Sequence, residues 1–312
     1  MPPLQFFESY LRFAYSKGGQ LLSAIFCVDK QGLKHFAVAA TSLAIHKPRN
    51  LAGAFLLTVD VQESDISSFF KSLKKNYELE FTLIQVPRHM FAPFPVFGHV
   101  TVGTYFRLMI GEVLPDDVSE VLYLDTDIVI HRDLETPLAE AATRLDASGH
   151  IAAAVAEESE TTRHLHEAGI LEGPYLQAGV MLINLPRWKE AFSLDYFVDI
   201  LATNKKNIVW WDQDILNIAL KDRWLQLPKI LNGTPGTRSS DTVTYHYAGS
   251  QKPWRFKADV QDKDIYEHYR RQTPSLRPLR IDPQTVIAHY TKPFRTAKKV
   301  LKKKLGIASK KR

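Results

Sequence analysis

From Ser23 to Val86, short apolar runs alternate with longer amphipathic stretches. Short apolar runs are typical of buried strands, and the longer amphipathic stretches between them are typical of helices. Strands are predicted at Ser23–Val28, Gly53–Val59 and Glu80–Val86. Helices are predicted at Lys34–His46 and Glu63–Asn76. This order of strands and helices predicts an α/β fold that opens with a parallel sheet.

The rest of the chain continues the pattern less regularly. Residues 87–98 are rich in proline and aromatic side chains, which predicts a loop, and 229–242 are rich in Gly, Ser, Thr and Pro, which predicts a mobile loop. Further strands are expected before Asp125, at Ile151–Ala156 and at Leu176–Leu185. Further helices are expected near His99–Gly111, Trp188–Ala202 and Trp211–Leu220.

Composition indicates a globular protein with a large core. The chain has 312 residues, of which 45% are hydrophobic. No apolar run approaches the length of a transmembrane helix, and the uncharged start at Met1–Leu4 lacks the basic region of a secretory signal. The single cysteine, Cys27, lies in an apolar run. One cysteine excludes an intrachain disulfide, and a core position in a reducing compartment is expected.

The basic residues are concentrated at the C-terminal end. After Asp282 the chain has ten basic residues and no acidic one, so the net charge of +6 leaves −4 for the rest. Small and apolar residues recur at helical spacing among these lysines, which predicts a basic amphipathic helix that binds an anionic membrane surface. A disordered solubilising tail, or one that binds nucleic acid non-specifically, is the alternative. No recognised nucleic-acid motif accompanies the charge, so no specific nucleic-acid partner is expected.

We therefore predict three parts. They are an N-terminal extension over 1–22, an α/β domain over 23–290 and a basic amphipathic tail over 291–312.

Two carboxylates one residue apart, Asp125 and Asp127, follow an apolar run that ends at Leu124. They fall where a predicted strand meets a loop, at the edge of an open α/β sheet where ligands bind. Residues i and i+2 of an extended chain point to the same side, so both carboxylates can converge on one cation. A hard divalent metal would relieve their repulsion. The alternative is a surface turn in which the two Asp side chains cap local backbone.

Other candidate residues lie in four separate segments. Asp29 follows the first strand, which lacks a G-x-G-x-x-G fingerprint, so a standard dinucleotide site is disfavoured and Asp29 either caps the next helix or binds a ligand. Arg107 lies on a predicted helix from which it could face the two carboxylates, and a solvated arginine is the alternative. Asp212 lies near the predicted start of another helix, where a capping role is the alternative. The segment His246–Trp254 contains a potential metal ligand, a glycine and a lysine suited to phosphate.

The run Leu124–Val129 also fits the nucleophile strand of haloacid-dehalogenase-like phosphatases, in which the first Asp attacks phosphorus. That strand normally opens its domain, whereas three predicted strands precede it here. No later apolar strand ends in Asp-Asp. The phosphatase interpretation is therefore disfavoured.

Four separated segments together resemble the signatures of glycosyltransferase family 8, both in their order and in their residue patterns. They are Val121–Ile130, Gln177–Trp188, Trp211–Leu220 and His246–Trp254, the last of which reads HxxGxxKPW. The resemblance runs from about Ser23 to Trp254 and is closest to bacterial galactosyl- and glucosyltransferases of lipopolysaccharide or lipooligosaccharide synthesis, with glycogenin more distant. It implies a GT-A nucleotide-diphospho-sugar transferase fold. It also implies transfer of a hexose, galactose or glucose, from a UDP-sugar to a saccharide of a bacterial cell-surface glycolipid, with retention of configuration.

The resemblance also implies roles for individual residues. Asp125, Asp127 and His246 would hold Mn²⁺, or Mg²⁺, and Gly249 and Lys252 would hold the diphosphate. The other donor-binding positions that the resemblance implies are Asp29 (at uracil), Arg107, Thr126, Gln177, Ala178, Asp212 and Gln213. Of these, Arg107, Asp212 and Gln213 would be catalytic. Gln213 is the family's debated nucleophile on the far face of the anomeric carbon, and a front-face mechanism with a leaving-group phosphate oxygen as base is the open alternative.

Three positions depart from the family pattern. Relatives carry Asp-Asp-Asn-Tyr where this chain has Asp29-Lys30-Gln31-Gly32, so an aromatic residue over the base is missing. Gln177 replaces a common Asn, and Glu157 stands where Asp is frequent. A degenerate sugar-nucleotide-binding protein is the non-enzyme alternative, although all three metal ligands are present. The expected location is cytoplasmic, peripheral on the inner face of the cytoplasmic membrane.

Overall fold

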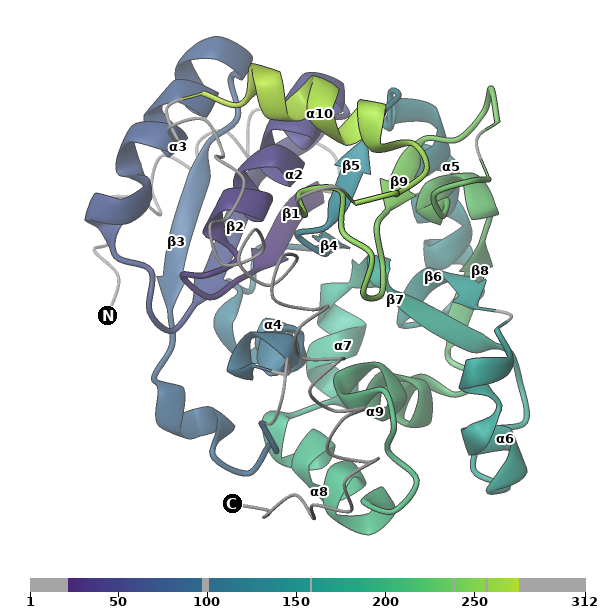
Figure 1. The fold of residues 1–312 in the computed structure, drawn as a ribbon. Helices are drawn as coiled ribbons and strands as arrows, with labels where there is room; N and C mark the ends of the chain where they lie inside the picture. Colours follow the sequence, from purple (N-terminus) through teal and green to yellow (C-terminus); the bar gives the residue numbers. More distant parts are fainter. Residues whose placement is uncertain (1–21, 97–100, 158, 238, 256–257, 275–312) are drawn as a thin grey trace, which may run out of the picture.

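The computed structural model describes residues 22–274 apart from 97–100, 158, 238 and 256–257 (Figure 1). The predicted tail over 291–312 lies outside the described residues. So does the predicted N-terminal extension, except that Leu22 begins the first strand.

A seven-stranded sheet forms the centre of the described chain, in the order β3-β2-β1-β4-β7-β6-β8. Its neighbouring strands are parallel except where β7 pairs with β4 and with β6. The strands are β1 Leu22–Cys27, β2 Leu51–Thr58, β3 Phe81–Gln85, β4 Glu120–Leu124, β6 Ala152–Glu157, β7 Tyr175–Asn184 and β8 Trp224–Leu227. The predicted α/β fold with a mainly parallel sheet is confirmed.

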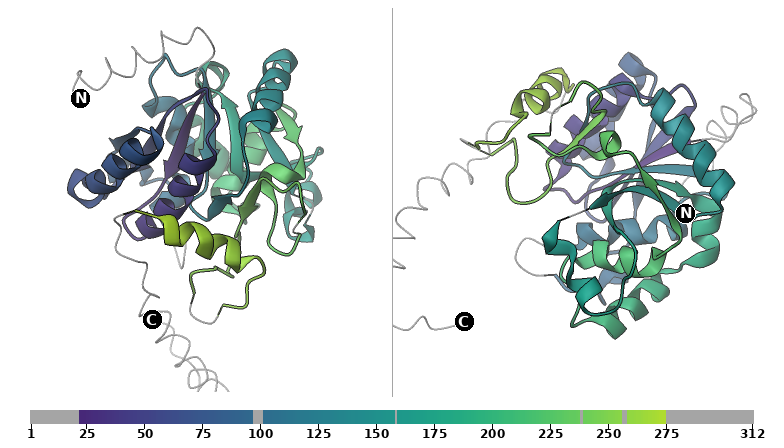
Figure 2. Two further views of the ribbon diagram at one scale, coloured as in Figure 1. Left: turned by 90° about the horizontal axis from the view of Figure 1, so that it is seen from above. Right: turned by 90° about the vertical axis from the view of Figure 1, so that its right-hand side faces the viewer.

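Two helical layers cover the faces of this sheet, as the views in Figure 2 show. Alternate residues of β1 point into different cores: Ile25 packs with the layer of η2, α7, α8 and α9, whereas Ala24 and Phe26 pack with that of α2, α3 and α5. The helices are α2 Leu33–His46, α3 Glu63–Tyr77, α4 Ile110–Val113, α5 Glu135–Ser148, α6 His164–Glu167, α7 Leu185–Ala191, α8 Leu194–Asn204, α9 Trp211–Leu220 and α10 Lys263–Gln272. The 3-10 segments are η1 Arg88–Phe91, η2 Val102–Met109, η3 Glu160–Thr162 and η4 Lys229–Asn232.

A separate two-stranded ribbon lies beyond the carboxyl end of β4. It pairs β5 (Ile128–Ile130) with β9 (Thr244–His246) in antiparallel register. A small apolar cluster holds this ribbon between α2 and α10, through Val38, Val129, Tyr245, Tyr247, Ile265, Tyr266 and Tyr269. The ribbon therefore brings the end of β9 next to the loop after β4, although these segments are far apart in the sequence (Figure 1).

Some predicted elements differ from the observed ones. The helix predicted near His99–Gly111 is mainly 3-10 helix, with only the short α4 at its end. The helix predicted over Trp188–Ala202 is two helices, because the Ser193 side chain accepts a hydrogen bond from the Tyr196 backbone N–H and starts α8. The predicted loop over 229–242 contains η4, of which Leu231 and Asn232 are buried.

Among the described residues, no helix has both the length and the apolar content needed to cross a membrane.

The aromatic cluster beneath α2 gives a test of the packing. Phe36 is fully buried, and its ring centroid lies 5.2 Å from that of Phe26 and 5.6 Å from that of Phe81. Phe36→Ala should lower the free energy of unfolding by about 3–5 kcal/mol, measured by urea denaturation, because it leaves a cavity in a close-packed core. The exposed Lys34 on the same helix is the control, and Lys34→Ala should change stability by no more than about 0.5 kcal/mol. Similar losses in the two variants would contradict this packing.

Candidate active site

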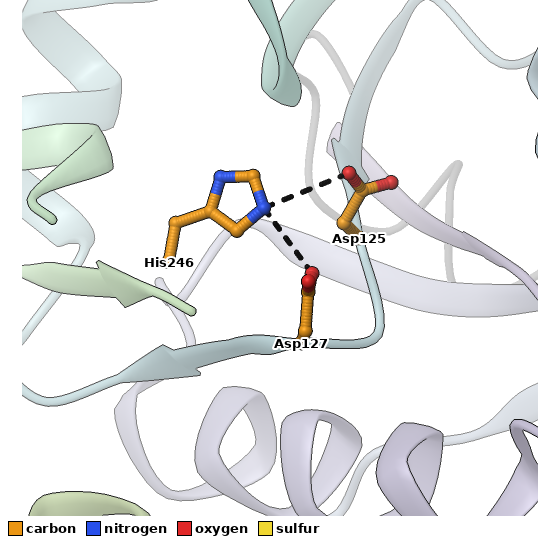
Figure 3. A group of neighbouring side chains, drawn as sticks. All are labelled: Asp125, Asp127 and His246. Atoms are coloured by element: carbon orange, nitrogen blue, oxygen red, sulfur yellow. Dashed lines mark ion pairs between the residues drawn. The ribbon is translucent and has the colours of Figure 1, made fainter. Parts of the chain in front are cut away.

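The side chains of Asp125, Asp127 and His246 converge at the carboxyl edge of the sheet (Figure 3). Asp125 follows β4, Asp127 immediately precedes β5, and His246 ends β9 opposite Ile128. The Nε2 atom of His246 lies 3.2 Å from Asp127 Oδ1 and 3.8 Å from Asp125 Oδ2. Potential ligand atoms of the three residues all lie within 4.8 Å of one another.

Two side chains contact the Nδ1 atom of the His246 imidazole. Its Nδ1 lies 3.1 Å from Asn232 Oδ1 and 3.0 Å from Gln177 Nε2. A proton on Nε2 faces the two carboxylates in this structure, and a bound cation would replace it, with the proton then on Nδ1 and donated to Asn232 Oδ1. A Cβ at Gly179 would overlap this ring, so the glycine of β7 is required for the imidazole to approach the strand.

This set of side chains fits a divalent cation. Two carboxylates and one imidazole suit Mn²⁺ better than Ca²⁺, and Mg²⁺ accepts the carboxylates. Although burial raises the pKa of Asp127, the charges of His246 and Lys252 dominate and hold that pKa well below its usual range. Asp127 is therefore ionised and available as a ligand at neutral pH.

Lys252 places a positive charge beside the acids. Its ammonium group forms an ion pair with Asp127 and donates a hydrogen bond of 2.8 Å to the carbonyl of Tyr247. Trp254, two residues after Lys252, stacks on His35 of α2 with ring centroids 3.6 Å apart. This contact anchors the segment that carries Lys252. Gly249 in this segment has a positive φ of 76°, a conformation that favours glycine.

Arg107 of η2 connects three further parts of the site. Its Nη2 lies 2.8 Å from Asp125 Oδ1, and its Nε lies 2.7 Å from Asp212 Oδ2. Its Nη1 donates a hydrogen bond of 2.7 Å to the carbonyl of Ala178. The guanidinium also lies over the Tyr123 ring, 4.6 Å from its centroid. One buried cation is thus shared by two carboxylates.

Asp212 and Gln213 begin α9 beside this arginine. Trp210 is the N-cap residue, and Asp212 lies in the first turn, where its carboxylate accepts hydrogen bonds from the backbone N–H groups of Asp212 and Gln213. Burial raises the pKa of Asp212 to about 7, against the opposing charge of Arg107. Gln213 Oε1 accepts a hydrogen bond of 2.9 Å from the Ala178 backbone N–H. Trp211, the first residue of α9, adopts a positive φ of 46°, which costs about 1–2 kcal/mol for an L-residue.

The remaining predicted residues lie around this centre. Asp29 follows β1, and its Oδ1 accepts a hydrogen bond of 2.9 Å from the Gly32 backbone N–H, a local turn that leaves its carboxylate outside the Asp125 cluster. Thr126 stands between the two acids and is half-buried. Gln177 Oε1 accepts hydrogen bonds from the Gly179 backbone N–H and from Asn232 Nδ2, at 2.7 and 2.5 Å.

Sequence reasoning missed two residues that contact this centre. The hydroxyl of Tyr123 donates a hydrogen bond of 2.5 Å to Asp125 Oδ1. Tyr123 lies two residues before Asp125, on β4, and this spacing is a signal that could have revealed it. Asn232, which supports His246, comes from the predicted loop 229–242, and no local pattern points to it.

A cavity of about 460 Å³ opens beside His246. It lies between the end of β6, the segment around η4 and the end of β9, and includes Gln177 in its wall. Its polar lining consists mainly of hydroxyl, amide and charged side chains, namely Glu157, Ser159, Gln177, Lys229, Asn232, Thr234, Thr237, Ser239, Thr242 and His246.

The fold is the GT-A fold of nucleotide-diphospho-sugar transferases. The galactosyltransferase LgtC, determined with donor and acceptor sugar analogues, matches with a TM-score of 0.71 over 81% of this chain and 97% of that chain, at 24% identity. GlyE of Streptococcus pneumoniae matches with a TM-score of 0.61 over 80% of this chain and 60% of that chain, at 21% identity. At these identities the two structures show the fold alone.

Sequence comparison gives the family. Residues 23–258 match the model of glycosyl transferase family 8, and the chain belongs to that family. It is 29% identical over 245 residues to the lipopolysaccharide 1,3-galactosyltransferase of Salmonella typhimurium, covering 73% of this chain and 71% of that protein. It is 25% identical over 262 residues to the lipopolysaccharide 1,2-glucosyltransferase of Escherichia coli K12, covering 78% and 75%. The family assignment replaces the phosphatase interpretation.

The raised pKa of Asp212 gives a test of this geometry. Between about pH 4 and pH 7 the folded protein keeps a proton on Asp212 that the unfolded chain has released. Folding therefore takes up a proton, so the contribution of Asp212 to stability becomes less favourable as pH rises through this window. Relative to the wild type, Asp212→Asn should gain stability as pH rises from about 4.5 to about 7.5, by up to about 1.4 kcal/mol per unit of pKa shift. Urea unfolding in metal-free buffer measures this difference, and a difference that is independent of pH would contradict the raised pKa.

Proposed function

We propose that the protein is a retaining, Mn²⁺-dependent transferase that moves a hexose, galactose or glucose, from a UDP-sugar to a saccharide of a bacterial cell-surface glycolipid. The observation that carries the proposal is the convergence of Asp125, Asp127 and His246 beside Lys252 and Arg107, in a chain of family 8. The names of the relatives, a lipopolysaccharide galactosyltransferase and a lipopolysaccharide glucosyltransferase, support the acceptor class.

The chemistry of the leaving group requires positive charge at this place. Breaking the bond between the hexose and the diphosphate leaves negative charge on UDP, which a bound divalent cation stabilises. Asp125, Asp127 and His246 are the residues that would hold this cation. Lys252 forms its ion pair with Asp127 in the present structure. We propose that it donates to the diphosphate when the donor is bound, with Gly249 leaving room for the phosphates.

The groups that we propose to orient the hexose already make some hydrogen bonds within the protein. The Oε1 of Gln213 already accepts a hydrogen bond from Ala178, and an amide is in any case a poor nucleophile. We therefore favour a front-face reaction, in which a leaving-group phosphate oxygen takes the proton of the acceptor hydroxyl. Asp212 accepts hydrogen bonds from donor hydroxyls, and Arg107 keeps its carboxylate in place. Thr126 and Gln177 flank the donor. Asp29, which follows β1, binds the uracil base.

We place the acceptor in the cavity beside His246. Its lining of hydroxyl and amide groups offers the many hydrogen bonds that a saccharide needs, and a volume of about 460 Å³ is in the range of small-molecule sites. The wall that the cavity shares with Gln177 and His246 puts the acceptor next to the metal-binding residues. A protein that binds sugar nucleotides without transfer is the second candidate, but the complete set of metal ligands favours the enzyme.

Asp127→Asn tests the proposed reaction. Screening UDP-sugars with the wild-type protein should reveal Mn²⁺-dependent donor hydrolysis that EDTA abolishes. In Asp127→Asn the charge of one ligand is lost at almost constant shape, so turnover should fall by at least a hundredfold. Asp116 is exposed and ion-paired with Lys189, and Asp116→Asn, as the control, should keep wild-type activity. Metal-independent turnover of similar rate in Asp127→Asn would refute the metal assignment. Tight binding of UDP-hexose by a wild-type protein that never turns it over would support the non-enzyme alternative.

We propose that the basic tail over 291–312 keeps the enzyme on the inner face of the cytoplasmic membrane, where lipid-anchored acceptors are exposed. The proposal rests on its ten-residue excess of positive charge after Asp282 and on its amphipathic pattern. Each basic residue near an anionic surface contributes about 1 kcal/mol. Deletion of 291–312 should release the protein from anionic liposomes at low salt and leave donor hydrolysis in solution unchanged. Equal liposome binding by the full-length and truncated proteins would refute this role.

A further inference from the structure

Asp214 of α9 is fully buried and surrounded by hydrogen-bond donors. Its Oδ1 accepts a hydrogen bond of 2.6 Å from the hydroxyl of Tyr175. Its Oδ2 accepts hydrogen bonds from the backbone N–H groups of Val209 and Trp210, at 2.6 and 2.7 Å. The Nε2 of His164 lies 2.9 Å from the same oxygen. A buried carboxylate needs such a set of donors, and each loss leaves charge uncompensated.

The first consequence of this network concerns the backbone before α9. Asp214 binds the amides of Val209 and Trp210, and the next residue, Trp211, has the strained φ of 46°. A strained residue persists only where its surroundings fix it. Asp214 therefore holds the turn from which Asp212 and Gln213 enter the site.

The second consequence concerns the side chain of Gln213. Its Nε2 donates a hydrogen bond of 3.3 Å to the hydroxyl oxygen of Tyr175, while its Oε1 accepts from Ala178. The hydrogen of the Tyr175 hydroxyl is committed to Asp214, so its oxygen is left as an acceptor for Gln213. The orientation of the Gln213 amide thus depends on Asp214.

His164 is the member of this network that packing alone does not explain. It comes from α6, outside the segments that carry the family signatures, and its Nε2–H donates to Asp214. Its Nδ1 is buried and has no hydrogen-bond partner in the part of the chain that the structure describes. The unsatisfied Nδ1 makes the polar ring unfavourable here, and the contact that offsets this cost is the hydrogen bond from Nε2–H to Asp214.

We propose that His164 is a positioning residue for hexosyl transfer. Through Asp214 it holds the amide of Gln213 and the turn at Trp211 in the geometry that the reaction requires, without touching the substrate itself. This inference rests on the proposed function. It also links the two substrates, because Ser159, in the segment that leads to His164, lines the cavity in which we place the acceptor.

Steady-state kinetics with UDP-hexose test this role. His164→Leu removes the donor to Asp214 and should lower kcat about tenfold to a hundredfold, the effect of losing one hydrogen bond to a charged group, with KM for the donor unchanged. His164→Gln carries an N–H donor of similar reach and should restore kcat to within about threefold of the wild type. Tyr175→Phe breaks the same network at its next link and should show the same division between kcat and KM.

His166 provides a matched control on the same helix. Its Nε2 lies 2.7 Å from the carbonyl oxygen of Gly173, and it makes no hydrogen bond to Asp214. His166→Leu should keep the wild-type kcat. Equal losses in His164→Leu and His166→Leu, an unchanged kcat in His164→Leu, or a raised KM at constant kcat would each overturn the inference.

Hydrogen exchange separates this inference from the proposed function. If the wild-type protein turns over no UDP-hexose, the proposed function is refuted, whatever the role of His164. The backbone amides of Val209 and Trp210 then still report on the network, because both donate to Asp214. His164→Leu should raise their exchange rates and His166→Leu should not. Unchanged exchange in His164→Leu would overturn the inference independently of activity.

Discussion

The shared guanidinium of Arg107 is the interaction on which the site depends. It lies between the carboxylates of Asp125 and Asp212, binds the carbonyl of Ala178, and is itself only 11% exposed. Removing one partner of a buried ion pair leaves an uncompensated charge, which is strongly destabilising. One arginine therefore fixes η2, the end of β4, β7 and the start of α9 relative to one another. Because one positive charge serves two acids, the site keeps an excess of negative charge, and the raised pKa of Asp212 reflects its burial within that imbalance.

This excess of negative charge suits the proposed reaction. Asp125 and Asp127 lie at the carboxyl edge of the sheet with His246 facing them, and the only cation that the described residues place on Asp127 besides the imidazole is Lys252. The positive charge of a divalent metal would replace that of Lys252 beside Asp127. The ammonium group of Lys252 would then pair with the negative charge of the diphosphate. Metal and nucleotide are then expected to bind together, because each completes the electrostatic partners of the other.

The sequence predicted much of the fold and the principal members of the site, for different reasons. The strands at Ser23–Val28 and Gly53–Val59 and the helix at Lys34–His46 were predicted nearly to their ends, because apolar periodicity is a local property. The break at Ser193 was missed because a cap within an amphipathic pattern does not interrupt the period. Asp125 and His246 could be grouped through the family resemblance, whereas Asn232, which supports His246, and the pair Asp214 and His164, which supports the start of α9, could not. These three depend on contacts between elements far apart in the sequence, such as η4 with β9 and α6 with α9, and no spacing in the sequence encodes them.

The affinity for Mn²⁺, with and without UDP, in the wild type and in Lys252→Gln tests the account most directly. Loss of the free Mn²⁺ signal in electron paramagnetic resonance measures it, and Lys189→Gln, which removes a surface ion pair with Asp116, is the control. Without nucleotide, Lys252→Gln should bind Mn²⁺ more tightly than the wild type, because Asp127 no longer carries a competing ammonium group. With saturating UDP the order should reverse, because the lysine that we assign to the diphosphate is missing. A change of the same sign in both conditions, or none in either, would contradict the proposal that Asp127 binds the metal and Lys252 the diphosphate.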